Sequence, residues 1–190
     1  MRTIIPEREN PALRMKAAEI PAAGITSTRI QTLIAEMKAL LAKEEFGVAL
    51  AAPQVGEALR LFVVSGRALA RDARSAPDEP VRQAQGRPGE KEGAEDVPPL
   101  PDQVYINPVL SKLSRAKSEK HEGCLSIRGK WGEVSRAEKA TIQACDEQGR
   151  KFIRGASGFL AHIFQHEMDH LEGILYTDKA TKVYEDTEEK

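Results

Sequence analysis

The hydrophobic positions between residues 25 and 45 recur with helical spacing. They fall three or four residues apart and would therefore share one face of a helix. They are Ile30, Leu33, Ile34, Met37, Leu40 and Leu41. Thr26, Ser27 or Thr28 can provide the N-cap, since a hydroxyl accepts a hydrogen bond from a free backbone N–H of the first turn. The segment is predicted to be a helix that packs this face against the core.

Shorter apolar runs with strand character occupy the middle of the chain. They cover residues 59–65, 104–113 and about 120–127. Residues 141–145 and 151–154 flank the polar sequence Asp146-Glu147-Gln148-Gly149, which predicts a β-hairpin. A last helix is predicted from about Ser157 to Gly173, because glycine is a preferred residue just after a helix. Strands in the middle and helices near both ends indicate an α+β fold in one domain, residues 1–190.

Residues 71–102 differ in composition from the rest of the chain. They hold six of the eleven prolines, with Val81, Val97 and Leu100 as the large apolar residues. Such a segment buries too little surface to offset its ordering entropy. It is predicted to be a flexible insertion, and a solvated loop is favoured over a docking element.

Composition excludes several classes of protein. Hydrophobic residues are 41% of the chain and aromatic residues 5%, so the core should be mainly aliphatic. A net charge of -1 gives no indication of nucleic-acid binding, and none is expected. No run approaches the roughly 18 apolar residues of a membrane span, and the first ten residues do not read as a secretion signal. A cytoplasmic location without membrane contact is expected, and an organelle is left open.

The strongest chemical signal is His166-Glu167-Met168-Asp169-His170 in the last predicted helix. Residues four apart lie on one helix face, about 6 Å from each other, so two imidazoles can grip one ion. Glu167 would lie beside them, within reach of a metal-bound water. The alternative is a charged helix surface with incidental histidines.

Geometry limits the choice of a third ligand. His162 and His170 are separated by about 12 Å of helix rise, too far to share one ion. His121 and Cys124 lie in a strand-like stretch, where alternation sends their side chains to opposite faces. A thiolate is a strong ligand for zinc or ferrous iron, which favours Cys124. Cys145 is interpreted as a small core residue.

Three segments resemble the signatures of the peptide deformylase family. They are residues 47–54 (GVALAAPQ), 122–126 (EGCLS) and 165–173 (QHEMDHLEG), in family order. The resemblance extends from about Leu13 to Tyr176, apart from the insertion. It implies a peptide-deformylase-like fold, in which mixed or antiparallel sheets surround a central, C-terminal metal-binding helix.

The resemblance also implies an activity, which is removal of the N-formyl group from formyl-methionine at the start of nascent polypeptides, with release of formate. The implied ligands of one divalent ion are Cys124, His166 and His170, with a fourth position for the nucleophilic water. Glu167 would act as general base and then as general acid. The oxyanion would meet the side-chain amide of Gln54 and the backbone N–H of Leu125.

Further expectations concern the ion, the substrate and the partners. The family's ion is Fe²⁺, and Zn²⁺, Ni²⁺ or Co²⁺ can occupy the same ligands. Val48, Ala49 and Gly123 would line the substrate groove, and Phe159 and Ile163 the methionine pocket, with ordinary core packing as the alternative for the last two. The partners would be formyl-methionyl nascent peptides. Contact with the ribosome near its exit tunnel stays open, because no long basic C-terminal docking helix follows Asp178.

The sequence departs from the family pattern at three positions. Ala49 replaces the usual second glycine of the first motif, Trp131 stands where Arg or Tyr is frequent, and His162 adds polarity at the pocket rim. Arg136 lies in a stretch, residues 134–139 (VSRAEK), that resembles the family's, and the resemblance implies that it pairs with Glu122 in a structural role.

Two other functions compete with deformylation. A general metallopeptidase would need a third His or Glu ligand after His170, and it leaves the Cys124 motif unexplained. A catalytically silent protein that binds N-terminal methionine has only Ala49 in its favour. Metal content and turnover of a formyl-Met peptide would separate the three.

Overall fold

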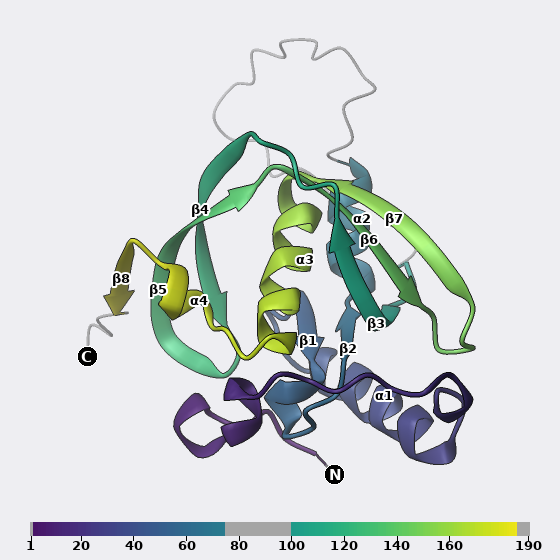
Figure 1. Cartoon of the computed structure of the whole chain (residues 1–190). Coiled ribbons are helices and arrows are strands. Elements are labelled where there is room, and N and C mark those ends of the chain that lie inside the picture. Colours follow the sequence, from purple (N-terminus) through teal and green to yellow (C-terminus); the bar gives the residue numbers. More distant parts are fainter. Residues whose placement is uncertain (1, 75–99, 186–190) are drawn as a thin grey trace, which may run out of the picture.

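The computed structural model describes residues 2–74 and 100–185, which form two antiparallel sheets and four α-helices (Figure 1). The five-stranded sheet has the order β1 (Ala49–Ala51), β2 (Leu61–Val64), β3 (Gln103–Ser111), β6 (Lys139–Cys145), β7 (Lys151–Ser157). The three-stranded sheet has the order β4 (Lys117–Cys124), β5 (Ile127–Ala137), β8 (Lys182–Glu185). The helices are α1 (Thr28–Leu41), α2 (Gly66–Arg74), α3 (Gly158–Leu171) and α4 (Tyr176–Lys179). The predicted α+β class is confirmed.

Helix α3 stands between the two sheets (Figure 1). Ser157 precedes its first turn, and Gly173, two residues past its end, has a φ of +74°. Leu160 and Phe164 on this helix are fully buried, and the Phe164 ring lies 5.2 Å from that of Tyr105 on β3. The prediction of a central helix near the C-terminus is confirmed, and this position brings its histidines between the sheets.

The predicted helix around residues 28–41 is also confirmed. Its buried face consists of Ile30, Leu33, Ile34, Met37 and Leu41. Ser27 is the N-cap, and its hydroxyl accepts a long hydrogen bond of 3.5 Å from the backbone N–H of Ile30. Because α1 packs on β1 and β2, it supports the edge strand of the sheet, which is part of the first motif, residues 47–54.

The predicted hairpin across residues 146–149 is present as β6 and β7, with Gly149 at φ +80° in the turn. The strand predicted for residues 120–127 is wrong in its extent. β4 ends at Cys124, a turn follows, and β5 begins at Ile127. β5 is missing from the sequence-based predictions because glycines and charged residues interrupt its alternation. Cys124 therefore lies at the last position of a strand, beside a tight reversal.

The ends of the predicted insertion also differ from expectation. Residues 71–74 complete α2, and Asp102 accepts a hydrogen bond of 2.8 Å from the N–H of Gly66. β2 and β3 are antiparallel neighbours, with Val64 opposite Gln103, so a short connection can join them. The interior of the insertion, residues 75–99, lies outside the described residues, and its predicted flexibility stays a prediction.

The N-terminal segment crosses the loops that carry the first two motifs. The backbone N–H of Ile5 donates to Gln54 O at 2.9 Å, and that of Glu7 donates to Ser126 O at 2.9 Å. The buried side chain of Asn10 donates to Pro53 O at 2.8 Å. These three bonds join the loop after β1 to the loop after β4.

Candidate metal centre

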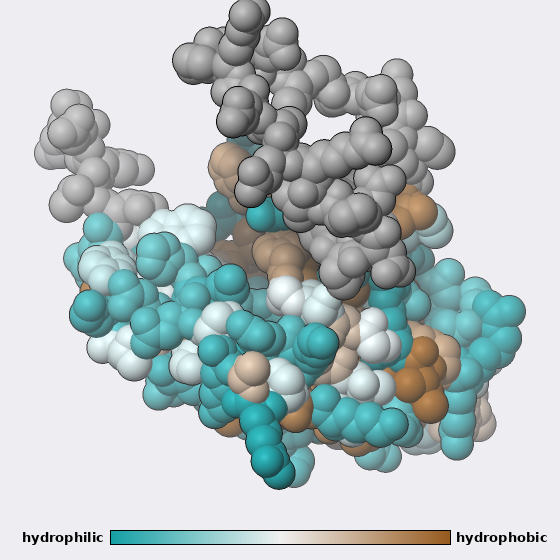
Figure 2. Space-filling view, turned by 90° about the horizontal axis from the view of Figure 1, so that it is seen from above, coloured by the Kyte–Doolittle hydropathy of each residue, from teal (hydrophilic) through white to brown (hydrophobic). Residues whose placement is uncertain are grey.

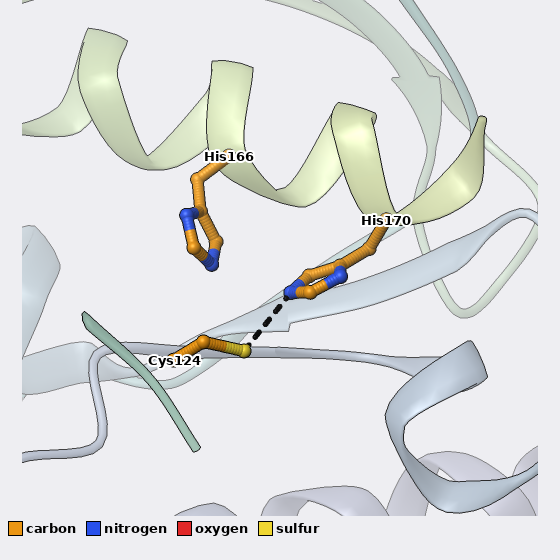
Figure 3. Close-up of side chains that lie close together, drawn as sticks. All are labelled: Cys124, His166 and His170. Carbon is orange, nitrogen blue, oxygen red and sulfur yellow. Dashed lines mark hydrogen bonds between the residues drawn. The ribbon is translucent and has the colours of Figure 1, made fainter. Parts of the chain in front are cut away.

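Cys124, His166 and His170 converge between β4 and α3 (Figure 3). One ligand atom from each residue lies within 4.8 Å of the others. Sγ of Cys124 is 3.4 Å from Nε2 of His170, and the two imidazole rings have centroids 4.8 Å apart. The convergence arises because His166 and His170 occupy successive turns of α3 while β4 ends opposite them. This arrangement places all three ligand atoms close enough to contact one ion.

The His166 ring is held from its far side by Glu122. Nδ1 of His166 lies 2.8 Å from Oε2 of this carboxylate, which is 4% exposed. A proton on Nδ1 leaves the lone pair of Nε2 for a ligand, as is usual in metal sites. Burial lowers the pKa of His166, but the contacts with Cys124 and Glu122 outweigh it and raise the pKa well above its usual value. The surroundings therefore favour a positive charge at this position.

The donor set fits a divalent transition metal. One thiolate and two imidazoles match the preferences of Zn²⁺ and Fe²⁺, and three protein ligands leave a position for water or substrate. His170 supports this, because burial lowers its pKa well below the usual value and keeps the ring neutral. Among the described residues, Cys124, His166 and His170 are the one cluster of this kind.

Glu167 lies next to His166 in the sequence and is 3% exposed. Its Oε2 has no hydrogen-bond partner among the described residues. Burial, assisted by the negative charge of Glu122, raises the pKa of Glu167 to about 7, against an opposing effect of His166. A carboxyl group with this pKa can both accept and donate a proton near neutral pH.

Gln54 brings a side-chain amide to the same site. It lies in the 3₁₀ turn Ala52–Val55, directly after β1. Its Oε1 accepts a hydrogen bond of 2.8 Å from the N–H of Ala51, which points Nε2 toward Cys124, at 3.4 Å from Sγ. Leu125, the other predicted oxyanion donor, directly follows Cys124 in the turn after β4.

A cleft of about 950 Å³ opens onto this cluster. The predicted substrate-binding residues that line it are Val48, Ala49, Gly123, Phe159 and Ile163. Seen from above, the surface is hollowed beside the grey atoms, and hydrophobic residues lie in the recess (Figure 2). Arg71 of α2 also lines the cleft, with its guanidinium 4.2 Å from the ring centroid of Phe159. Arg71 was missed because its segment reads as part of the insertion.

The remaining candidates are placed as follows. His162 contacts Glu122 through Nε2 at 2.6 Å and is not in the ligand cluster. His121 is exposed and lies 3.7 Å from Glu133. Cys145 is half-buried and packs against the core beside α1.

Arg136 lies on β5 and is almost fully buried. Its Nε and Nη2 donate to Glu122 at 2.7 and 3.0 Å, which confirms the expected pair. Its Nη1 donates to the carboxylate of Asp169 at 2.6 Å, and Nζ of Lys179 on α4 donates to the same carboxylate at 2.6 Å. This network links the metal-binding helix to β4, β5 and α4.

An α+β fold with one thiolate, two imidazoles from a single helix and a buried carboxyl group beside a cleft defines a candidate metallohydrolase. Comparison with known proteins gives the family: residues 3–186 match the sequence model of polypeptide deformylases, so the chain belongs to that family. It is 35% identical over 170 residues to peptide deformylase 1A, chloroplastic/mitochondrial, of Arabidopsis thaliana, and 35% identical to peptide deformylase 1A, chloroplastic, of Solanum lycopersicum. These alignments cover 90% of this chain, but only 58% and 56% of the two relatives.

Solved structures support the same fold. The crystal structure of Arabidopsis thaliana peptide deformylase 1B in complex with an inhibitor superposes with a TM-score of 0.72 at 31% identity, over 96% of this chain and 82% of the other. Peptide deformylase from Thermotoga maritima gives 0.71 at 24% identity, over 96% and 99%, and shows the fold alone. Within the described residues, no helix is both long and apolar enough to cross a membrane.

Proposed function

We propose that this protein is a metal-dependent peptide deformylase that hydrolyses the N-formyl amide of formyl-methionyl nascent peptides and releases formate. The observation that carries the proposal is the convergence of Cys124, His166 and His170, with ligand atoms within 4.8 Å of one another, beside a cleft that Cys124 and His166 line. Membership of the polypeptide deformylase family supports it.

Cys124, His166 and His170 would hold one divalent ion, and Fe²⁺ is proposed as the native one. When bound, such an ion lowers the pKa of water and polarises a carbonyl group. Zn²⁺, Ni²⁺ and Co²⁺ are compatible with the same donors.

Glu167 is proposed to carry the proton of the reaction. It accepts a proton from the attacking water as oxygen bonds to the formyl carbon, and it returns the proton to nitrogen as the C–N bond breaks. Formate and a free amine result. The pKa of about 7 suits both steps, because the buried carboxyl group can lose and regain a proton near neutral pH.

Gln54 and Leu125 are proposed to stabilise the negative charge that develops on the formyl oxygen. The hydrogen bond from Ala51 fixes the Gln54 amide with its NH₂ group toward Cys124. A donor held in place before reaction costs no reorganisation, and one such donor is worth about 10²–10³ in rate.

The cleft provides a place for an extended peptide. β1 is the outer strand of its sheet and pairs only with β2 among the described strands, so its other edge offers backbone groups near Ala49. Val48 O itself accepts a hydrogen bond of 2.9 Å from the N–H of Ser65, so Val48 would contribute its side chain to the groove. The backbone of Gly123 packs closely against Trp131, because a Cβ at this position would be 2.8 Å from the indole ring. Phe159 and Ile163 present an apolar wall for the methionine side chain. The proposed compartment is the cytoplasm, and contact with the ribosome is left as a hypothesis.

Formate release tests the proposal. Protein purified without oxygen, loaded with Fe²⁺ or Ni²⁺ and shown to hold one ion per chain, should release formate from formyl-Met-Ala. No formate above the metal-only blank would refute the proposal. Cleavage of unformylated peptides would instead favour a metallopeptidase, and tight binding of peptide without turnover would favour the silent binding protein.

A further inference from the structure

Glu122 receives hydrogen bonds from three side chains. His162 Nε2 lies 2.6 Å from Oε1, and His166 Nδ1 lies 2.8 Å from Oε2. Arg136 donates to both oxygens, at 2.7 and 3.0 Å. The carboxylate is thus bound at four points in a site that excludes solvent.

His162 and His166 lie one turn apart on the same face of α3, so Glu122 on β4 spans two turns of the helix with its two oxygens. Arg136 bonds to both oxygens and His166 to Oε2, so the carboxylate is already restrained about the bond to its last methylene group. The contact from His162 to Oε1, the oxygen that His166 does not use, adds a further restraint on this rotation. It thereby helps to fix the direction in which Oε2 meets the His166 ring.

The two histidines of the metal cluster differ in the hydrogen bonding of their Nδ1 atoms. Nδ1 of His166 is held by Glu122, and its ring lies near that of Tyr176, with centroids 6.4 Å apart. Nδ1 of His170 is buried, and no described protein atom bonds to it. The protein therefore sets the orientation of one imidazole by a direct hydrogen bond, and that bond depends on Glu122.

We propose that His162 is a positioning residue for the metal centre, which acts through Glu122 to orient His166 and is not itself a ligand. The inference rests on the proposed function only in taking Cys124, His166 and His170 as the ligands. It gives a specific role to His162, which the sequence alone identifies only as a polar residue at the pocket rim. Since partners behind a ligand typically change metal affinity by about 10–100-fold, loss of this indirect one should cost about 10-fold.

The test compares two substitutions of similar size in the full-length protein. His162→Gln keeps an N–H donor that can reach Glu122, whereas His162→Leu keeps the bulk and removes the donor. His121→Leu is the control, because it removes an exposed imidazole that lies near a different carboxylate. Zn²⁺ affinity is measured by competition with a fluorescent chelator, which requires no turnover. The Co²⁺-loaded proteins are compared by their thiolate-to-metal absorption, which reports ligand geometry.

The expected result is that His162→Leu raises the apparent Kd for Zn²⁺ about 10-fold and shifts the Co²⁺ spectrum, while His162→Gln and His121→Leu stay within about threefold of the parent. Unchanged affinity in His162→Leu would overturn the proposal, as would an equal loss in His162→Leu and His162→Gln. If His162→Leu fails to fold, His162→Ser replaces it, and the comparison with His162→Gln is read in the same way. Absence of formate release from the parent would refute the proposed function and leave this result standing.

Discussion

Replacing Arg136 by methionine should be one of the most damaging single changes in the part of the chain that the structure describes. The side chain of Arg136 is 4% exposed, and its guanidinium group donates to Glu122 and Asp169. Methionine has similar length but offers no charge and no donor. Among the described residues, the Glu122 side chain would then keep only its two histidines, and that of Asp169 only Lys179.

The size of the effect follows from burial. Removing one partner of a buried ion pair leaves an uncompensated charge and costs about 3–5 kcal/mol. In a domain of this size that loss corresponds to a fall in Tm of about 6–20 °C. Burial of Glu122 pushes its pKa upward, but the bonds from His162, His166 and Arg136 outweigh it and hold the pKa well below its usual range. The charged carboxylate thus depends on these donors.

Arg150→Met is the matched control. Arg150 also donates to a carboxylate at 2.7 Å, that of Asp146, but its side chain is 75% exposed. An exposed pair of this kind contributes about 0.2–1 kcal/mol. Urea unfolding of both variants should be followed by circular dichroism with a chelator present, so that metal binding does not alter the stability. A loss below about 1 kcal/mol for Arg136→Met, or equal losses in both variants, would refute the reasoning.

Four further results are expected. Glu167→Gln should keep one ion per chain by elemental analysis and lose about 10²–10⁴ in formate release, because it removes a proton carrier and no ligand; near-normal turnover would contradict this. Cys124→Ala should lose the ion itself under the same analysis. Gly173→Ala should destabilise more than Gly129→Ala in urea unfolding, since both have positive φ but only the Cβ at Gly173 would meet backbone, at 2.9 Å. Replacing residues 75–99 by a short Gly/Ser bridge should leave metal content and turnover close to the parent, because loop closure entropy changes slowly with length; a collapse of turnover alone would show that the insertion shapes the substrate groove.

The sequence predicts best those features that depend on local spacing. The helical repeat from Ile30 to Leu41 appears as α1, and His166 and His170 share a face of α3 because residues four apart must do so in any helix. The exclusion of His162 as a ligand partner of His170 is of the same kind. It depends on helix rise and needs no tertiary information.

Features that depend on contacts between distant segments escape such reasoning. Nothing local shows that Glu122 bridges His162 and His166, since strand and helix meet only in the folded chain. α2 is hidden for another reason. Its residues, GRALARDAR, include good helix formers, but the proline-rich stretch that follows dominates the composition of the whole segment. The contact of Arg71 with Phe159 is hidden with it.

The bonds from the N-terminal segment have a consequence for measurement. The amide hydrogens of Ile5 and Glu7 are bound to the carbonyl groups of Gln54 and Ser126, so each can exchange with solvent only when its bond opens. Their exchange rates therefore report on movement between the two loops that border the candidate centre, from residues that contribute no side chain to it. A peptide from the first ten residues, followed by mass spectrometry in deuterated water, would record that opening with no probe attached near the cleft.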